Sequence, residues 1–77
     1  MPEIDDKIKE IVAEQLGLDT SKVELDSKLV SDLGTDSLDL VEIQMAIESE
    51  FDISIDDDEM EEVVSVGDFS EIVGERM

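Results

Sequence analysis

Hydrophobic positions recur along the chain at the three- and four-residue spacings that are typical of helices. In residues 3–16 the apolar positions are separated by four, three, one and four residues, which places them on one face of an amphipathic helix. Pro2 suits the first turn of this helix, and Gly17 suits its C-terminal end. The apolar face comprises Ile4, Ile8, Ile11, Val12 and Leu16.

Residues 17–35 contain apolar side chains without a sustained period. A connection of this length is unusual in a compact domain, so we expect a loop that is packed by its own apolar residues. A short helical turn is expected at residues 31–33.

The next block predicts a helix over residues 37–51, with Asp36 as its N-cap and Asp39 reaching back to the cap. At about 100° per residue, its apolar side chains form two separate arcs. The inner arc is Leu40, Ile43, Ile47 and Phe51, and the outer arc is Leu38, Val41 and Met45. The inner arc can face the core. The outer arc either forms a docking face or packs under the 17–35 loop.

Two further helices are expected near the end of the chain. One covers about residues 57–63 after the cap Asp56, and the other covers about residues 66–75 after Ser65. We find no convincing strand. The prediction is an all-α, single-domain bundle over residues 1–77, with three longer helices, one short helix and a long loop between the first two.

The charge of the chain is strongly negative and uneven. Acidic residues number 24 against 5 basic ones, a net charge of −19. Residues 36–77 hold 15 acids and one base, Arg76, a net of −14. This balance excludes nucleic acid and anionic membranes as ligands and favours proteins with basic patches. Because 40% of the residues are hydrophobic and lie in ordered blocks, we expect a folded monomer rather than a disordered chain.

No stretch is long or apolar enough to span a membrane, and no signal segment opens the chain, so we expect no membrane insertion and a cytoplasmic location. With no histidine or cysteine, no nucleophile–base pair and no metal site is predicted. The acidic run 56–59 lacks the alternating ligands and turn glycine of a calcium loop, and we interpret it as a capped helix start.

Ser37 is the residue that stands out. It follows Gly34 and Asp36 at the first turn of the second helix, where free backbone N–H groups and the positive dipole end favour an anion. A serine there, taken alone, is also explained by helix capping.

The segment GTDSLD at residues 34–39, with the helical pattern that follows, closely resembles the Asp-Ser-Leu motif of acyl carrier proteins. The resemblance extends over nearly the whole chain. It implies that Ser37, between Asp36 and Leu38, carries 4′-phosphopantetheine taken from coenzyme A. It further implies that the protein holds acyl groups as thioesters for fatty acid biosynthesis and is not itself an enzyme.

The resemblance also implies partners and two further sets of residues. The partners are a phosphopantetheinyl transferase (holo-carrier synthase) and fatty acid synthesis enzymes with basic docking patches. The docking set on the second helix is Asp36, Leu38, Asp39, Val41, Glu42, Met45 and Glu48. The interior set, into which an acyl chain can slip, is Leu40, Ile47, Ile55, Met60 and Val63. Without an acyl group, we expect that interior to be filled.

Two alternatives remain open. One is a specialised carrier for polyketide, aminoacyl or envelope-lipid chemistry, and the other is an unmodified scaffold that binds partner helices. Peptidyl carriers usually have Gly-Gly-x-Ser around the serine, so Thr35 and Asp36 before Ser37 favour the acyl class. Asp56 stands where many acyl carriers have proline, and Ser31 where an acidic residue is common, which is compatible with a specialised carrier.

Overall fold

The computed structural model describes residues 2–77 and consists of helices joined by loops. The elements are α1 (Pro2–Leu16), the 3₁₀ helix η1 (Thr20–Lys22), α2 (Ser37–Phe51), α3 (Asp57–Glu62) and α4 (Val66–Arg76). The prediction of three longer helices and one short helix is confirmed, and the helix boundaries differ from the expected ones by at most one residue. The helix η1 was not predicted.

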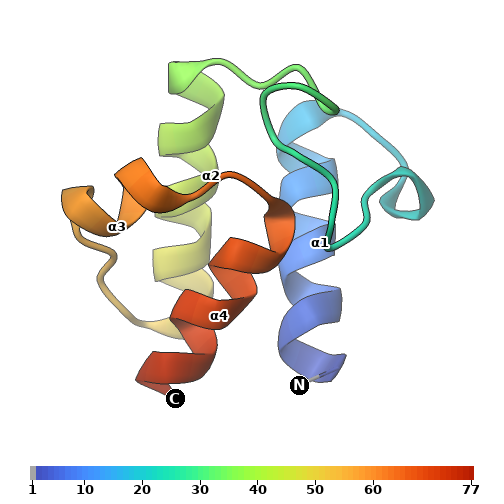
Figure 1. The fold of residues 1–77 in the computed structure, drawn as a ribbon. Coiled ribbons are helices and arrows are strands. Elements are labelled where there is room, and N and C mark those ends of the chain that lie inside the picture. Colours follow the sequence, from blue (N-terminus) through green and yellow to red (C-terminus); the bar gives the residue numbers. More distant parts are fainter. Residues whose placement is uncertain (1) are drawn as a thin grey trace.

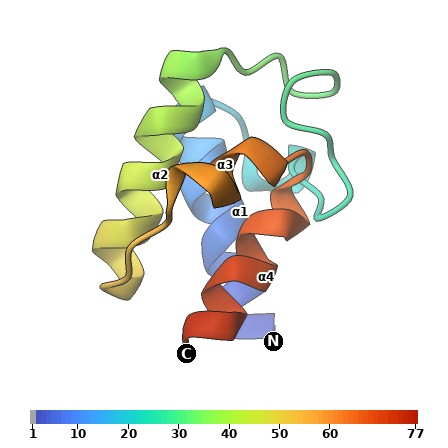
Figure 2. The same ribbon diagram turned by 60° about the vertical axis from the view of Figure 1, so that its left-hand side comes forward.

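Helices α1 and α2 run in opposite directions along the bundle, and α4 packs against α1 (Figure 1). The start of α1 and the end of α4 lie at the same end of the molecule, whereas α2 begins at the opposite end (Figure 1). The turned view shows the short α3 lying across the bundle between α2 and α4 (Figure 2). The long loop that follows α1 lies mostly on the side of the molecule away from α2, and its last part crosses to the start of α2 (Figures 1 and 2).

The core is formed by the apolar faces that the helical spacing predicts. Its fully buried side chains include Ile8 and Val12 from α1, Ile43 and Ile47 from α2, and Phe69 and Val73 from α4. The loop also contributes to this core, because Val23 and Leu29 are buried. The expectation of a loop packed by its own apolar residues is therefore confirmed.

Backbone hydrogen bonds fasten the long loop to the segment that leads into α4. The N–H of Leu29 donates to Val64, that of Val66 to Ser27 and that of Gly67 to Leu25, at 2.9, 3.0 and 2.8 Å. We call these three bonds the loop ladder; they surround an isolated antiparallel bridge between Lys28 and Ser65. The chain segments approach so closely that a Cβ at Gly67 would lie 3.1 Å from the Leu25 carbonyl oxygen. Sequence periodicity did not reveal this ladder.

The turn expected at residues 31–33 is present as a hydrogen-bonded turn rather than a helix. The N–H of Asp32 donates to the Lys28 carbonyl at 2.9 Å, and that of Gly34 donates to Val30 at 3.1 Å. These bonds have the spacing of helical bonds, so the turn brings the chain compactly to the start of α2.

The contrast between the two arcs of α2 leads to a stability prediction. Ile47 is 0% exposed and Met45 is 61% exposed on the same helix. Ile47→Ala should lower the free energy of unfolding by about 2–5 kcal/mol, because it leaves a cavity in the core. Met45→Ala, the matched control, should change it by less than about 0.5 kcal/mol. Urea unfolding followed by circular dichroism measures both values, and equal losses would contradict the assignment of the arcs.

Candidate functional site

The start of α2 is closed by a capping box. Asp36 has an extended backbone, with φ −109° and ψ −176°, and its side chain accepts a hydrogen bond from the Asp39 N–H at 2.8 Å. The Asp39 carboxylate accepts in return from the Asp36 N–H at 3.4 Å. The predicted roles of Asp36 as N-cap and of Asp39 as the residue that reaches back to it are confirmed.

Ser37 is the first residue of α2 and is exposed to solvent. The first N–H groups of a helix have no intrahelical acceptor, so the region beside Ser37 is electropositive although the chain is acidic. Gly34 has φ 70°, and a Cβ built on it would meet no atom within 4 Å. Gly34 thus permits the backbone conformation before the serine and leaves open space there.

Thr35 anchors the chain just before Ser37. It is 5% exposed, and its N–H donates to the Leu29 carbonyl at 3.0 Å. Its Oγ1 is buried without a hydrogen-bond partner within the described chain. A polar residue between Gly34 and Asp36 is normally read as exposed, so the sequence held no signal for this anchor.

The outer arc of α2 lies on the surface. Leu38, Val41 and Met45 are 64%, 46% and 61% exposed. The alternative in which this arc packs under the 17–35 loop is therefore wrong. Three large apolar side chains in one row, next to Ser37, form the kind of small exposed patch that marks interaction sites.

The acidic residues of the docking set differ in their surroundings. Asp36 and Glu42 are exposed, and Asp39 is half-buried. Glu42 also accepts a hydrogen bond from the amide of Gln15 on α1. Glu48 is half-buried, and its carboxylate accepts from the backbone N–H of Ile55 at 2.7 Å. Sequence reasoning treated Glu48 as a surface charge and missed this contact.

The interior set does not form a uniform group. Ile47 and Ile55 are buried in the core, whereas Leu40, Met60 and Val63 are half-buried. Leu40 and Val63 line an open pocket of about 190 Å³ that is shared with residues 28–31.

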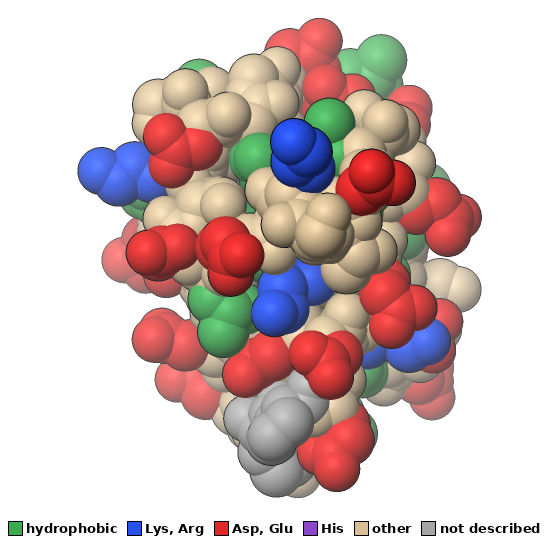
Figure 3. Space-filling view, turned by 90° about the vertical axis from the view of Figure 1, so that its right-hand side faces the viewer, with side chains coloured by type: hydrophobic (Ala, Val, Ile, Leu, Met, Phe, Trp, Pro, Cys, Tyr) green, Lys and Arg blue, Asp and Glu red, His purple; other side chains and the backbone are tan. Residues whose placement is uncertain are grey.

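The basic residues lie outside α2 in the sequence. Every lysine belongs to α1 or to the long loop, and α2 contains no base. The space-filling view of the side opposite α2 shows basic side chains scattered among acids (Figure 3). Lys7 on α1 comes within 3.9 Å of Glu50 near the C-terminal end of α2. The exposed residues on either side of Ser37 are the acidic Asp36 and the apolar Leu38.

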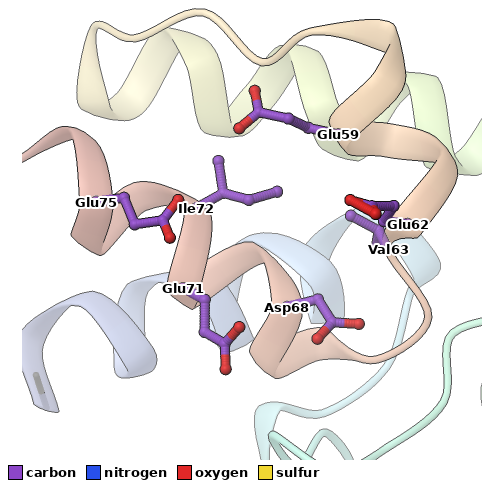
Figure 4. A pocket seen from close by; sticks show the side chains of 7 residues that line it. All are labelled: Glu59, Glu62, Val63, Asp68, Glu71, Ile72 and Glu75. Atoms are coloured by element: carbon purple, nitrogen blue, oxygen red, sulfur yellow. The ribbon is translucent and has the colours of Figure 1, made fainter.

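A groove of about 200 Å³ between α3 and α4 has two apolar side chains, Val63 and Ile72, among five acids (Figure 4).

The hydrogen bond from the Arg76 guanidinium lowers the pKa of Glu59 and raises that of Arg76. Backbone N–H groups of Ser65 and Val64 lower the pKa of Asp68. Within residues 2–77 no group of three or more Asp or Glu side chains is arranged to hold a metal ion. These contacts are those of a helix pairing and a helix cap.

None of the helices in residues 2–77 combines the length and the apolar character that crossing a bilayer requires.

Comparison with known proteins shows what this chain is similar to. A family model described as the phosphopantetheine attachment site matches residues 6–73. An acyl carrier protein of Clostridium acetobutylicum is 52% identical over 63 residues, covering 82% of each chain. One of Thermotoga maritima is 44% identical over 75 residues, covering 97% of this chain and 93% of the relative.

A solved structure from Mycobacterium tuberculosis, provisionally described as an acyl carrier protein, superposes with a TM-score of 0.90. It is 30% identical and covers 96% of this chain and 99% of its own.

The capping box at the start of α2 can be tested separately from any modification. Asp36→Ala should lower the free energy of unfolding by about 0.5–2 kcal/mol, because the Asp39 N–H loses its acceptor. Asp36→Asn keeps a side-chain oxygen at this position, so it should lower the free energy of unfolding by only about a few tenths of a kcal/mol. Chemical denaturation compares the variants. An equal loss for Asn and Ala would show that charge, rather than the hydrogen bond, stabilises the helix start.

Proposed function

Because the chain belongs to the acyl carrier proteins, we propose that Ser37 bears its phosphopantetheine arm and that the protein shuttles acyl groups between enzymes of fatty acid biosynthesis. Members of this family are carriers rather than catalysts. The observation that supports the proposal most directly is the exposed position of Ser37 at the first residue of α2.

The residues around Ser37 suit a phosphate-linked arm. The hydroxyl is accessible, Gly34 leaves open space beside it, and the N-terminus of α2 favours the negative charge of a phosphodiester. The arm supplies a terminal thiol, a group that this cysteine-free chain does not contain. Asp36 and Asp39 bond to each other's backbone and so hold Ser37 at a fixed place on a stable helix end.

Attachment needs a base from outside the chain. The Ser37 oxygen forms the new bond to phosphorus, coenzyme A loses its nucleotide part as the leaving group, and the hydroxyl proton passes to a base of the transferase. The chain has no histidine, and the carboxylate of Asp36 is engaged with the Asp39 N–H. The protein therefore contributes the position of the nucleophile and not its activation.

The outer arc of α2 is the proposed docking face for the transferase and the synthesis enzymes. Leu38, Val41 and Met45 present apolar surface, and Met is flexible enough to fit several partners. Asp36 and Glu42 are exposed beside this arc and would pair with basic residues around an enzyme entrance. Such a small contact is expected to form fast and dissociate fast, which suits a shuttle.

We further propose that the protein acts as a cytoplasmic monomer with one carrier domain. An acyl chain would enter between Leu40 and Val63, which line the open pocket, and reach the buried Ile47 and Ile55. A specialised pathway is the second candidate, because Ser31 and Asp56 depart from the common acyl carrier pattern.

Modification of Ser37 is tested by intact mass. Incubation with coenzyme A and a phosphopantetheinyl transferase should add one phosphopantetheine to the wild-type chain and none to Ser37→Ala. Ser49→Ala, which alters another exposed serine of α2, is the matched control and should be modified as fully as the wild type. An unmodified wild-type chain, or a modified Ser37→Ala, would overturn the proposal. The acyl groups found on protein from its native cells separate fatty acid synthesis from a specialised pathway.

Electrostatic docking is tested by reversing one charge beside the outer arc. Glu42→Lys should slow association with a basic synthesis enzyme by roughly two- to tenfold at low salt and should weaken the salt dependence of that rate. Glu14→Lys makes the same charge change at an exposed position of α1 and should slow association less. Stopped-flow fluorescence measures both rates. Equal effects of the two variants would show that net charge alone, without a docking face, governs association.

A further inference from the structure

The loop between α2 and α3 is attached to α2 by two side chains that bond the backbone of one residue. Glu48 accepts from the Ile55 N–H at 2.7 Å, and the Gln44 amide donates to the Ile55 carbonyl at 3.0 Å. Gln44 and Glu48 are four residues apart on α2, so their side chains lie one above the other on the same face. Both backbone polar groups of the buried Ile55 are therefore satisfied by α2.

These two bonds hold the residue that comes just before the N-cap of α3. Ile55 directly precedes Asp56, the N-cap of α3, whose N–H donates to Glu59 at 3.0 Å. The connection leaves α2 through Asp52, a residue in the left-handed conformation with φ 56°. A connection of this kind has little stiffness of its own, so its register depends on what holds Ile55.

Helix α3 has few other attachments to the bundle. It is six residues long, and none of its residues is fully buried. Met60 packs partly against the core, and Glu59 bonds Arg76 on α4. Met60 and Glu59 both lie within α3, whereas the two bonds to Ile55 hold the segment that enters it. Ile55, at this entrance to α3, belongs to the same buried core cluster as Ile47.

We propose that Gln44 and Glu48 are positioning residues that hold segment 52–63 closed against α2 and thereby set how long an acyl chain stays inside the protein. The second part of this statement rests on the proposed function, and the first part does not. Glu48 then acts mainly as a hydrogen-bond acceptor inside the fold, rather than as a charge for docking enzymes.

The first part is tested on the unmodified protein by amide hydrogen exchange measured with NMR. Glu48→Leu and Gln44→Leu should each raise amide exchange rates in segment 52–63, at Ile55 or its neighbours, by about tenfold. Each variant removes one of the two bonds that hold Ile55. Exchange at Val12 and Val73 in the core should stay unchanged, which shows that the fold persists. Glu50→Leu makes the same substitution at an exposed site of α2 and should leave segment 52–63 as in the wild type.

A conservative variant distinguishes the hydrogen bond from the charge. Glu48→Gln retains a side-chain oxygen that can accept from Ile55, so its exchange rates should stay close to those of the wild type. Exchange in segment 52–63 that is unchanged in both Leu variants would overturn the proposal. Exchange in Glu48→Gln that rises as much as in Glu48→Leu would also overturn it, because charge would then be the cause.

The second part is tested with an octanoyl arm loaded from octanoyl-coenzyme A. Hydroxylamine should cleave the thioester severalfold faster in the two Leu variants than in the wild type and in Glu50→Leu. Equal cleavage rates together with faster amide exchange would overturn the role in chain retention. Intact mass of the wild type after loading reports on the proposed function by itself, so its failure cannot be mistaken for failure of the positioning role.

Discussion

The presentation of Ser37 depends on the backbone hydrogen bonds that hold the long loop. The loop ladder fixes residues 25–29 against residues 64–67, and Thr35 then bonds back to Leu29. Through this chain of contacts, a serine at the start of α2 is positioned relative to α4, although the two are far apart in the sequence. Without these bonds, a connection of this length would be free to move, and the start of α2 would move with it.

Helix α2 is required to bury one face and expose another, and both faces are apolar. Ile43 and Ile47 on the buried face pack into the core and supply the stability of the helix. The exposed outer arc contributes little to that stability, so it can be shaped by its partners. The capping box at Asp36 and the half-buried Glu48 hold the two ends of the same helix to their neighbouring loops. A rigid helix of this kind can present a docking surface at low entropic cost.

The helices could be predicted from the sequence because their signals are local. Apolar spacing and the pairs Asp36 with Asp39 and Ser65 with Asp68 act within a few residues of one another, and the structure contains both capping boxes. The contacts that were missed join residues that lie farther apart in the sequence than a capping motif spans. The loop ladder and the attachment of Ile55 to α2 depend on how the helices pack, and no local pattern encodes that. Thr35 was missed for the same reason, since its burial follows from the fold and not from its polarity.

The distribution of primary amines in this chain has a practical consequence. All four lysines lie in α1 or the long loop, and none lies in α2, α3 or α4. A fluorophore or a sensor surface coupled through lysine would hold the molecule by its first 28 residues. Attachment through Lys7 or Lys9 on α1 would leave Ser37 free to meet an enzyme in solution, because α2 begins at the end of the bundle opposite the start of α1 (Figure 1).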